Sequence, residues 1–374
     1  MKVPLALPQA RVRRCVLAAL LFAVVPGAAA APLIQTNLVS NIPGLAIHTD
    51  ANLRNPWGIA ESGSSPFWIS DNHTGLSTLY NTTGMPLPRV VTIPPAPGAP
   101  AGTLGSPTGI IRNDNAGAFG GASFVFATED GVIAAWSGGT TATVAADLSP
   151  SGAVYKGLAG GTTSEGDFLY GTDFTNGTID VFDASFAPVS GKFFDDPNVP
   201  KGFAPFGIRN IDGALYVTYA RQKPGTIDDD PGLGNGFVDV FDTNGHLQQR
   251  LISRGPLDSP WGLAIAPAGF GQFAGDLLVG NFGNGLINAF DPGTGAFLGT
   301  LRDRTGKPIQ NDGLWALQFG NGGNGGRPDV LYITAGLNDE EDGLFAAIHV
   351  PEPATLPLIV LAIAALARAR RHAR

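Results

Sequence analysis

Short apolar runs alternate with short polar runs along the chain from about residue 33 to about residue 350. The apolar runs are rich in Val, Ile, Phe, Tyr and Trp, and they are separated by Gly, Asn, Asp and Pro. The first group of residues favours strands and the second favours turns. The 3.6-residue spacing of an amphipathic helix is almost absent between the two ends. The pattern therefore predicts an all-β body.

One apolar run recurs with a glycine near its centre, as NPWGIA, SPTGII, VYKGLA, APFGIR and SPWGLA, and more loosely as GLWALQF. The shared glycines are spaced by 51, 48, 50 and 55 residues: Gly58, Gly109, Gly157, Gly207 and Gly262. Two further apolar runs and a more polar fourth run follow in the units. Six units of four strands predict a six-bladed β-propeller with four-stranded blades. The glycine lets the inner strands of neighbouring blades approach closely.

The last unit lacks a fourth strand at the C-terminal end, because its third run leads directly into Pro351. The segment LIQTNLVSNI, which begins at Leu33, precedes the first unit and has strand character. We expect residues 33–41 to supply the outer strand of the last blade. This pairing would keep the ring from opening, and the propeller would then cover residues 31–350.

Residues 1–30 have the organisation of a secretory signal peptide. Basic residues precede the apolar run Cys15–Val25, and the small residues Ala28–Ala30 fit a cleavage site after Ala30. Cys15 is the only cysteine of the chain. After cleavage the body would have no disulfide and no thiol nucleophile, although its exported setting would permit disulfides.

The C-terminal segment reads VPEPATLPLIVLAIAALARARRHAR. Residues 354–367 carry no charge, and as a helix they would span about 21 Å at 1.5 Å per residue. This is shorter than the roughly 30 Å hydrocarbon core of a bilayer. Arginines follow the run, and arginines beside an apolar helix stay on the cytoplasmic side of a membrane. A buried C-terminal helix of the fold is the alternative, although several arginines after the run would be unusual in a core.

The same segment resembles a PEP-CTERM sorting signal of Gram-negative bacteria. The matching parts are a Pro-Glu-Pro triplet, a short hydrophobic helix at about residues 354–367 and a basic end: Pro351, Glu352, Pro353, Arg368, Arg370 and Arg371. The resemblance implies that residues 351–374 are recognised by exosortase, a membrane protease that cuts near the motif. The protein would be exported, held transiently in the membrane by its C-terminus, and then placed at the cell surface or outside the cell.

The body resembles a family of exported propeller proteins of unassigned function that often carry this tail. The matching pieces are NPWGIA, ATEDGVIAAW, VYKGLA, GNGFVDVFD, SPWGLAIAP, LLVGNFGNGLINAFDP and DGLWAL, and they cover most of residues 33–350. The body is also distantly similar to NHL, gluconolactonase and streptogramin-lyase propellers. A propeller fold alone does not determine a function.

The formal charge of the whole chain is −8, but the basic residues are concentrated at its ends. The body from about residue 31 to about residue 350 has 15 basic and 30 acidic residues. A negative field of this size disfavours nucleic acid and anionic lipid as partners. It is compatible with a bound cation, or simply with solubility.

In a propeller, the loops that enter the inner strands and the loops between strands two and three lie on one face. We expect the following polar and aromatic residues there: Asn55, Trp57, Asp71, Asn72, Glu129, Asp130, Lys156, Asp173, Phe206, Trp261, Asn281 and Trp315. Carboxylate and amide oxygens are the ligands that Ca²⁺ prefers. The resemblance to gluconolactonase-type propellers implies a central ion, with Glu129, Asp173, Asn72 and Asn281 as the nearest analogues in kind. Alternatively, these Asn and Asp residues cap β-turns.

Aromatic residues and one histidine are further candidates on this face. Trp57, Trp261 and Trp315 recur at the starts of units, where they would stack on sugars if exposed or pack between blades if buried. His73 follows Asp71 and Asn72 in a predicted loop and is the best candidate for a general base.

Two functions from different classes agree with these features. The first is an exported, non-catalytic propeller that acts at the cell surface or in the extracellular matrix, with exopolysaccharide as a candidate partner. The alternative is a metal-dependent hydrolase, lactonase or lyase with its site on the propeller axis. The sequence does not identify a ligand or substrate for either one.

Overall fold

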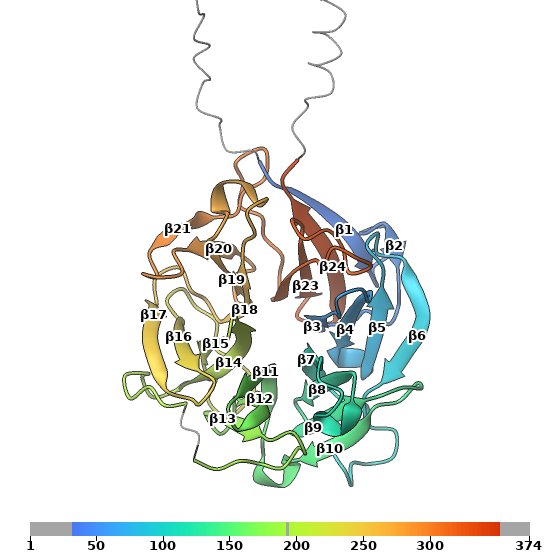
Figure 1. Ribbon diagram of the computed structural model, residues 1–374. Helices are drawn as coiled ribbons and strands as arrows, with labels where there is room; N and C mark the ends of the chain where they lie inside the picture. Colours follow the sequence, from blue (N-terminus) through green and yellow to red (C-terminus); the bar gives the residue numbers. More distant parts are fainter. Residues whose placement is uncertain (1–31, 192–193, 352–374) are drawn as a thin grey trace, which may run out of the picture. The chain divides into compact units, whose positions relative to one another are not determined.

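The computed structural model describes residues 32–191 and 194–351. The expected signal peptide and the expected membrane helix lie outside the described residues. Within them, strands form six sheets arranged as a ring around a central axis (Figure 1). The described part contains no α-helix, and none of its helical turns is long and apolar enough to cross a membrane. The predicted six-bladed β-propeller is confirmed.

Each blade runs from an inner strand at the axis to an outer strand at the rim. The first blade contains β3 (Pro56–Ala60), β4 (Phe67–Asp71), β5 (Leu76–Tyr80) and β6 (Pro86–Thr92). The second contains β7 (Pro107–Arg112), β8 (Phe124–Thr128), β9 (Val132–Trp136) and β10 (Thr143–Asp147). The third contains β11 (Tyr155–Thr163), β12 (Gly166–Asp173) and β13 (Thr178–Phe182).

The remaining three blades follow in chain order. The fourth contains β14 (Phe203–Ile211), β15 (Ala214–Arg221), β16 (Gly236–Asp242) and β17 (Leu247–Ser253). The fifth contains β18 (Pro260–Ile265), β19 (Leu277–Asn281), β20 (Ile287–Phe290) and β21 (Phe297–Thr300). The sixth contains β22 (Leu314–Phe319), β23 (Leu331–Leu337), β24 (Asp342–His349), β1 (Ile34–Ser40) and β2 (His48–Thr49). Short 3₁₀ turns lie between strands: η1 (Asn72–Thr74), η2 (Phe119–Gly121), η3 (Ser149–Ser151) and η4 (Gly271–Phe273).

The third blade differs from the other five, because its described residues form three strands. A single antiparallel bridge joins Phe182 to Pro188 where the chain leaves β13. The gap in the described residues, 192–193, follows soon after this bridge. The chain then enters β14 of the next blade.

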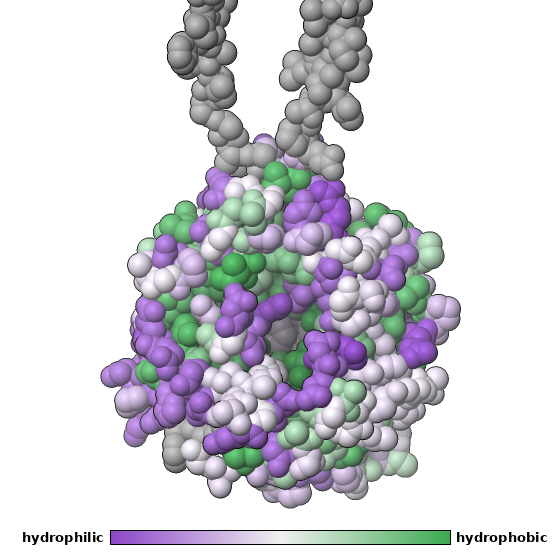
Figure 2. Space-filling view, in the orientation of Figure 1, coloured by the Kyte–Doolittle hydropathy of each residue, from purple (hydrophilic) through white to green (hydrophobic). Residues whose placement is uncertain are grey.

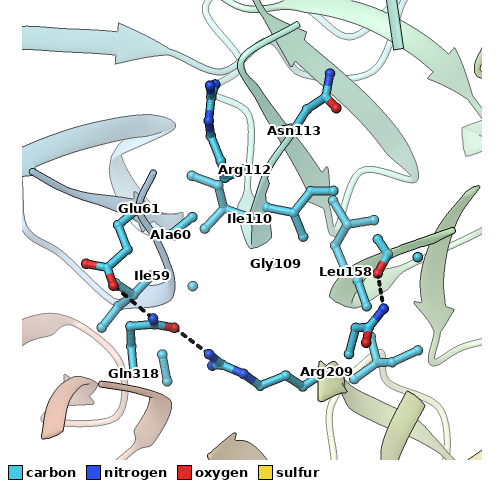
Figure 3. A pocket seen from close by; sticks show the side chains of 18 of the residues that line it. Ile59, Ala60, Glu61, Gly109, Ile110, Arg112, Asn113, Leu158, Arg209 and Gln318 are labelled. Carbon is cyan, nitrogen blue, oxygen red and sulfur yellow. Dashed lines mark hydrogen bonds between the residues drawn. The ribbon is translucent and has the colours of Figure 1, made fainter. Parts of the chain in front are cut away.

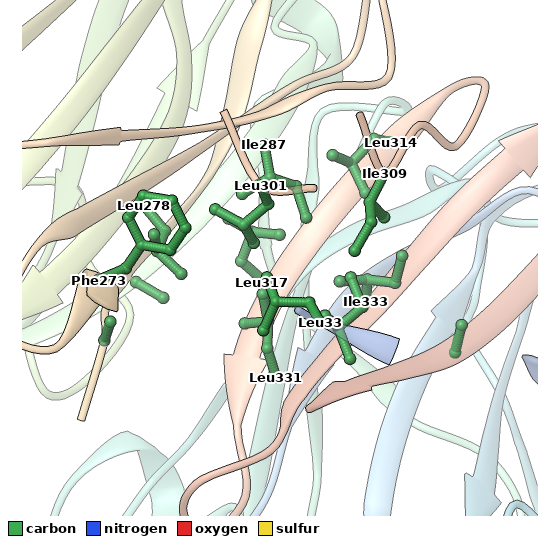
Figure 4. Close-up of a cluster of buried hydrophobic side chains, with 14 of the residues drawn as sticks. Leu33, Phe273, Leu278, Ile287, Leu301, Ile309, Leu314, Leu317, Leu331 and Ile333 are labelled. Atoms are coloured by element: carbon green, nitrogen blue, oxygen red, sulfur yellow. The ribbon is translucent and has the colours of Figure 1, made fainter. Parts of the chain in front are cut away.

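The N-terminal strand closes the ring. β1 pairs antiparallel with β24, from Ile34 opposite His349 to Ser40 opposite Leu344, and thus lies outside the last strand of the chain. This is the position expected for residues 33–41. Buried aliphatic and aromatic side chains, including Leu33 beside the start of β1, join the fifth and sixth blades in one hydrophobic cluster (Figure 4). The first and last strands of the propeller are therefore held together by both hydrogen bonds and apolar packing.

The recurring glycines allow the inner strands to lie almost in contact. A Cβ atom at Gly109 would lie 2.3 Å from the backbone nitrogen of Leu158 in the next blade. A Cβ atom at Gly207 would lie 2.2 Å from the carbonyl oxygen of Trp261. Buried hydroxyls join the same strands, as where Thr334 Oγ1 donates to the carbonyl oxygen of Trp57 at 2.5 Å. The axis is consequently lined by backbone and by the few side chains that flank each glycine.

Candidate functional site

The axis of the propeller has two different ends because all six inner strands run along it in the same direction. The glycine position is occupied by the shared glycine in five units and by Ala316 in the sixth. The residue before it lies near the start of each inner strand: Trp57, Thr108, Lys156, Phe206, Trp261 and Trp315. The residue after it lies further along: Ile59, Ile110, Leu158, Ile208, Leu263 and Leu317. We call the end at the strand starts the closed end and the other the open end.

Aromatic side chains fill the closed end. The rings of Trp57 and Trp315 stack with their centroids 3.5 Å apart and an interplanar angle of 18°. Phe282 stacks on Trp315 at 4.2 Å, and Trp261 contacts both tryptophans edge-on. Trp57 and Trp315 are only 2% and 1% exposed. These two therefore pack between blades, as one of the two interpretations expects, and in this conformation they offer no surface to a sugar; Trp261 is half-buried.

A buried ion pair lies against this aromatic cluster. Lys156 Nζ donates to Glu129 Oε1 at 2.5 Å, and Asn72 Nδ2 donates to Glu129 Oε2 at 2.9 Å. The lysine side chain is 4% exposed, and its ammonium lies 5.3 Å from the ring centre of Trp57. Burial alone would raise the pKa of Glu129, but the charge and hydrogen bond of Lys156, with the bond from Asn72, bring it below its ordinary value.

The residues expected to bind Ca²⁺ are only partly brought together. Asn72 and Glu129 meet, but Lys156 already supplies a positive charge to that carboxylate. Asp173 accepts hydrogen bonds from the backbone N–H groups of Val154 and Asn176, and Asn281 donates to the carbonyl of Pro256 at 2.8 Å. In residues 32–191 and 194–351, no group of three or more His, Cys, Asp or Glu side chains is placed to hold a metal ion. The four residues fit a Ca²⁺ site poorly, and the ion stays a prediction.

Two further carboxyl groups at the closed end belong to acidic runs, 228–230 and 339–342, which their sequence alone would predict to be solvated loops. Asn55 Nδ2 donates to Glu340 Oε2 at 2.6 Å, and Asn55 Oδ1 accepts from Trp315 Nε1 at 3.0 Å. Burial raises the pKa of Glu340 to about 7 and that of Asp229 to about 6, while Lys156 lowers both. Both residues lie in loops between strands, and their burial corrects the expectation of a solvated loop.

His73 lies in η1, next to Asn72, and is exposed. Its backbone N–H donates to the carbonyl of Arg54 at 3.4 Å. No hydroxyl or thiol is bonded to its ring among the described residues, so its role as a general base stays a prediction without structural support.

The open end contains a large cavity. The ring is hollow at its centre, with hydrophilic residues around the hollow on the face shown in Figure 2. The cavity has a volume of about 860 Å³ and extends from the glycines to the last residues of the inner strands. Its walls include Ile59, Ile110 and Leu158 (Figure 3). Trp261 also lines it. The aromatic cluster of the closed end thus forms the floor of the cavity at the level of Trp261.

Three polar side chains cross one side of this cavity as a chain of hydrogen bonds (Figure 3). Arg209 of β14 donates through Nη1 to the carbonyl of Leu317 at 2.8 Å and through Nη2 to Gln318 Oε1 at 2.6 Å. Gln318 Nε2 in turn donates to Glu61 Oε1 at 3.1 Å. These bonds connect the fourth, sixth and first blades. The arginine must therefore pass the fifth blade on its axial side.

The carboxyl group of this chain is unusual. Burial raises the pKa of Glu61 to about 8, although the hydrogen bond from Gln318 and the charge of Arg209 oppose the rise. Glu61 Oε2 is buried and lacks a hydrogen-bond partner. At neutral pH the carboxyl group is therefore mostly protonated and uncharged. Arg209 forms no ion pair with any residue of the described ranges.

Other polar residues surround the mouth of the cavity. Asn115 Nδ2 donates to Asp167 Oδ2 at 2.5 Å, and Asn210 Nδ2 donates to the carbonyl of Gly160 at 2.8 Å. Arg112 Nε lies 3.4 Å from Asp114 Oδ1. The charged side chains named at the mouth thus contact one another or an amide group. The candidate residues expected from the sequence lie at the closed end, and none of the polar residues at this mouth is among them.

Most of the chain is similar in sequence to two proteins of one virus. Protein R648 of Acanthamoeba polyphaga mimivirus is 32% identical over 329 residues, which cover 83% of this chain and 78% of that protein. Protein L690 of the same virus is 30% identical over 335 residues, covering 83% of this chain and 84% of that protein. The chain belongs to the family of these proteins. Both members are described as uncharacterized, so the family brings no activity to the chain.

The C-terminal residues match a known sorting motif, and the propeller superposes on a solved structure. Residues 349–371 match the PEP-CTERM protein-sorting motif. This member of the family therefore carries the recognition signal for exosortase, which implies export and sorting to the cell surface. A solved structure of streptogramin B lyase superposes with a TM-score of 0.51 at 13% identity, covering 85% of this chain and 97% of that one. This likeness shows the fold alone.

Proposed function

We propose that this protein is an exported, exosortase-sorted propeller that binds a ligand in its axial cavity without transforming it. The observation that carries the proposal is the cavity of about 860 Å³ at the open end. Small-molecule sites measure roughly 300–1,000 Å³ and combine apolar walls with a few placed polar groups. The aliphatic walls and the chain of Arg209, Gln318 and Glu61 have this composition.

The sorting signal gives the setting. An N-terminal signal peptide would bring the chain across the inner membrane, and the C-terminal helix would hold it there until exosortase cuts near Pro351. The mature propeller would then act at the cell surface or in the extracellular matrix. Exopolysaccharide is the partner that we propose, because sugar units combine apolar faces with hydroxyl groups and the cavity offers both kinds of wall.

The experiment compares the purified full-length protein with a variant whose cavity is filled. Ile110 lines the wall, and Ile110→Trp places an indole in the cavity. Leu298→Trp adds the same group at a site that is 50% exposed, and it serves as the control. The probes are oligosaccharides from the exopolysaccharide of the organism that produces the protein. We expect calorimetry to show that they bind the native protein and Leu298→Trp, and that they bind Ile110→Trp at least tenfold more weakly. Equal binding to all three proteins would contradict the proposal.

A hydrolase or lyase is the second candidate, and one observation favours it. A carboxyl group with a pKa near neutral pH is suited to general acid–base catalysis, and Glu61 has such a pKa inside a cavity. If this candidate is correct, the native protein cleaves a lactone or glycan and Glu61→Gln loses most of the rate. Binding without turnover in both proteins supports the non-catalytic proposal.

A further inference from the structure

The charge of Arg209 is the least compensated feature of the axial cavity. A guanidinium group has five N–H donors. Two bonds of Arg209 are made, and both acceptors are neutral: the carbonyl of Leu317 and Oε1 of Gln318. Arg209 is half-buried, and a charge that is partly removed from water is stabilised when a partner of opposite charge binds it. Arg209 therefore has unused donors, and no anion of the described residues is hydrogen-bonded to it.

Neighbouring carboxylates do not fill this role. Glu61 reaches Arg209 only through Gln318, and burial keeps Glu61 mostly uncharged at neutral pH. Asp114 lies beside Arg112. Asp167 accepts hydrogen bonds from Asn115 and Thr162 at 2.5 Å each.

The route of the side chain places its charge inside the cavity. Arg209 starts from the fourth blade and bonds to the sixth, so its guanidinium lies between them on the axial side (Figure 3). Gln318 fixes one edge of the guanidinium, which reduces the entropy lost when a ligand binds. An Arg with its plane held in this way suits a planar carboxylate, which it can bind through two parallel hydrogen bonds.

We infer that the axial cavity binds a carboxylate-bearing organic molecule, with Arg209 as the residue that holds the carboxylate. The inference rests on the proposed function and adds the chemical class of the ligand. Ile59, Ile110 and Leu158 contact the body of the ligand, so that body is compact and has an apolar face. Sugar acids and alicyclic carboxylic acids share this chemistry.

Three probes test the class by calorimetry on the full-length protein at pH 7. Glucuronate supplies a sugar acid, glucose supplies its neutral counterpart, and cyclohexanecarboxylate supplies a carboxylate without hydroxyl groups. We expect at least one carboxylate to bind at least tenfold more tightly than glucose. Binding of glucuronate alone identifies a sugar acid, and binding of both identifies a general carboxylate site. Equal affinity for all three probes would overturn the inference.

Two variants then assign the residue. Arg209→Gln keeps hydrogen-bond donors and removes the charge, and it should weaken carboxylate binding at least tenfold, which is 1.4 kcal/mol. Arg304→Gln removes an exposed arginine elsewhere and should change nothing. Unchanged carboxylate binding by Arg209→Gln would also overturn the inference. If Arg209→Gln does not fold, Arg209→Lys, which keeps the charge but loses the planar fork, replaces it with the same expectation of weaker binding.

Failure of the inference can be told apart from failure of the proposed function. If neutral oligosaccharides bind the native protein but not Ile110→Trp, and carboxylates bind no better than glucose, the cavity is a binding site and the ligand class is wrong. If no oligosaccharide and no carboxylate binds the native protein, both the inference and the proposed function are wrong.

Discussion

The two ends of the axis are built from the same six strands, yet they differ in how the space between those strands is used. At the closed end, aromatic side chains such as Trp57 and Trp315 fill the centre. A few residues further along the strands, Ile59 and its counterparts leave a cavity of about 860 Å³. In a ring of similar units the axis belongs to no single blade, so side-chain size at one or two positions decides whether it is closed or hollow.

The ends also differ in how they balance charge. At the closed end, Lys156 is paired with Glu129 inside the protein. At the open end, Arg209 has only neutral partners in the described residues. A cation that the chain neutralises itself contributes to the fold, whereas one left without a counter-charge is available to a ligand. The closed end thus contributes to the fold, and the open end has the properties of the binding site that we propose.

The strongest test of the closed end is Lys156→Met. This change leaves Glu129 largely buried without its cation, and breaking a buried pair from one side costs about 3–5 kcal/mol. Urea unfolding should show this loss. Lys156→Met combined with Glu129→Gln removes both charges and should recover most of it. A loss of less than about 1 kcal/mol in the single variant would mean that the pair does not support the fold.

Melting curves of the same proteins with and without millimolar Ca²⁺ test the calcium prediction. A ligand that binds only the folded state at 100 times its Kd stabilises it by about 2.7 kcal/mol. A rise in Tm for the native protein would confirm the prediction. A rise for Lys156→Met alone would show that the lysine takes the place of the ion, and no rise in either protein would rule the ion out.

The glycine layer separates the two ends, and Gly109→Ala tests it. The new Cβ would meet the backbone nitrogen of Leu158 at 2.3 Å, so two inner strands must move apart. Overpacking of this kind costs about 1–3 kcal/mol. Gly63→Ala is the control, because a Cβ there has no neighbour within 4 Å. Equal stability of the two variants in urea would show that the close approach of the strands is not required.

Much of the fold could be predicted because the repeat carries its own physical reason. Gly109 and Gly207 recur at positions where a side chain would strike the backbone of the next blade. The last unit lacks a fourth strand, and the segment after Leu33 has strand character. Together these two features predicted the pairing of β1 with β24. These constraints are local in the sequence or depend on counting strands, and both are visible without coordinates.

The polar residues of the open-end cavity were harder to predict, because they meet across blades that are far apart in the sequence. Arg209 and Gln318 are separated by 109 residues, and no local pattern joins them. The aligned units nevertheless contain a pattern that points to these residues. The second residue after the glycine position is small or aliphatic in four of the six units: Ala60, Ile111, Ala159 and Ala264. Arg209 and Gln318 are the two polar exceptions at that position. Departures from the repeat therefore indicated the open end better than the candidate residues of the loops.

Glu61→Gln tests the open end through the pH dependence of stability. Because the pKa of Glu61 is raised from 4.5 to about 8 in the folded protein, the folded state keeps a proton that the unfolded state has lost between these values. Stability should therefore fall as pH rises from about 4.5 to about 8. Glu61→Gln removes this dependence, so the variant should match the native protein at pH 4.5 and exceed its Tm at pH 8.5.

The same titration should act on ligand binding. Above pH 8 the ionised Glu61 adds a negative charge near Arg209, and carboxylate affinity should decline in the native protein but not in Glu61→Gln. The other charged residues that line the cavity, Arg112, Asp114 and Asp167, remain in both proteins. They therefore cancel in the comparison. Parallel pH profiles for the two proteins would show that the Glu61 carboxyl group is not coupled to the cavity.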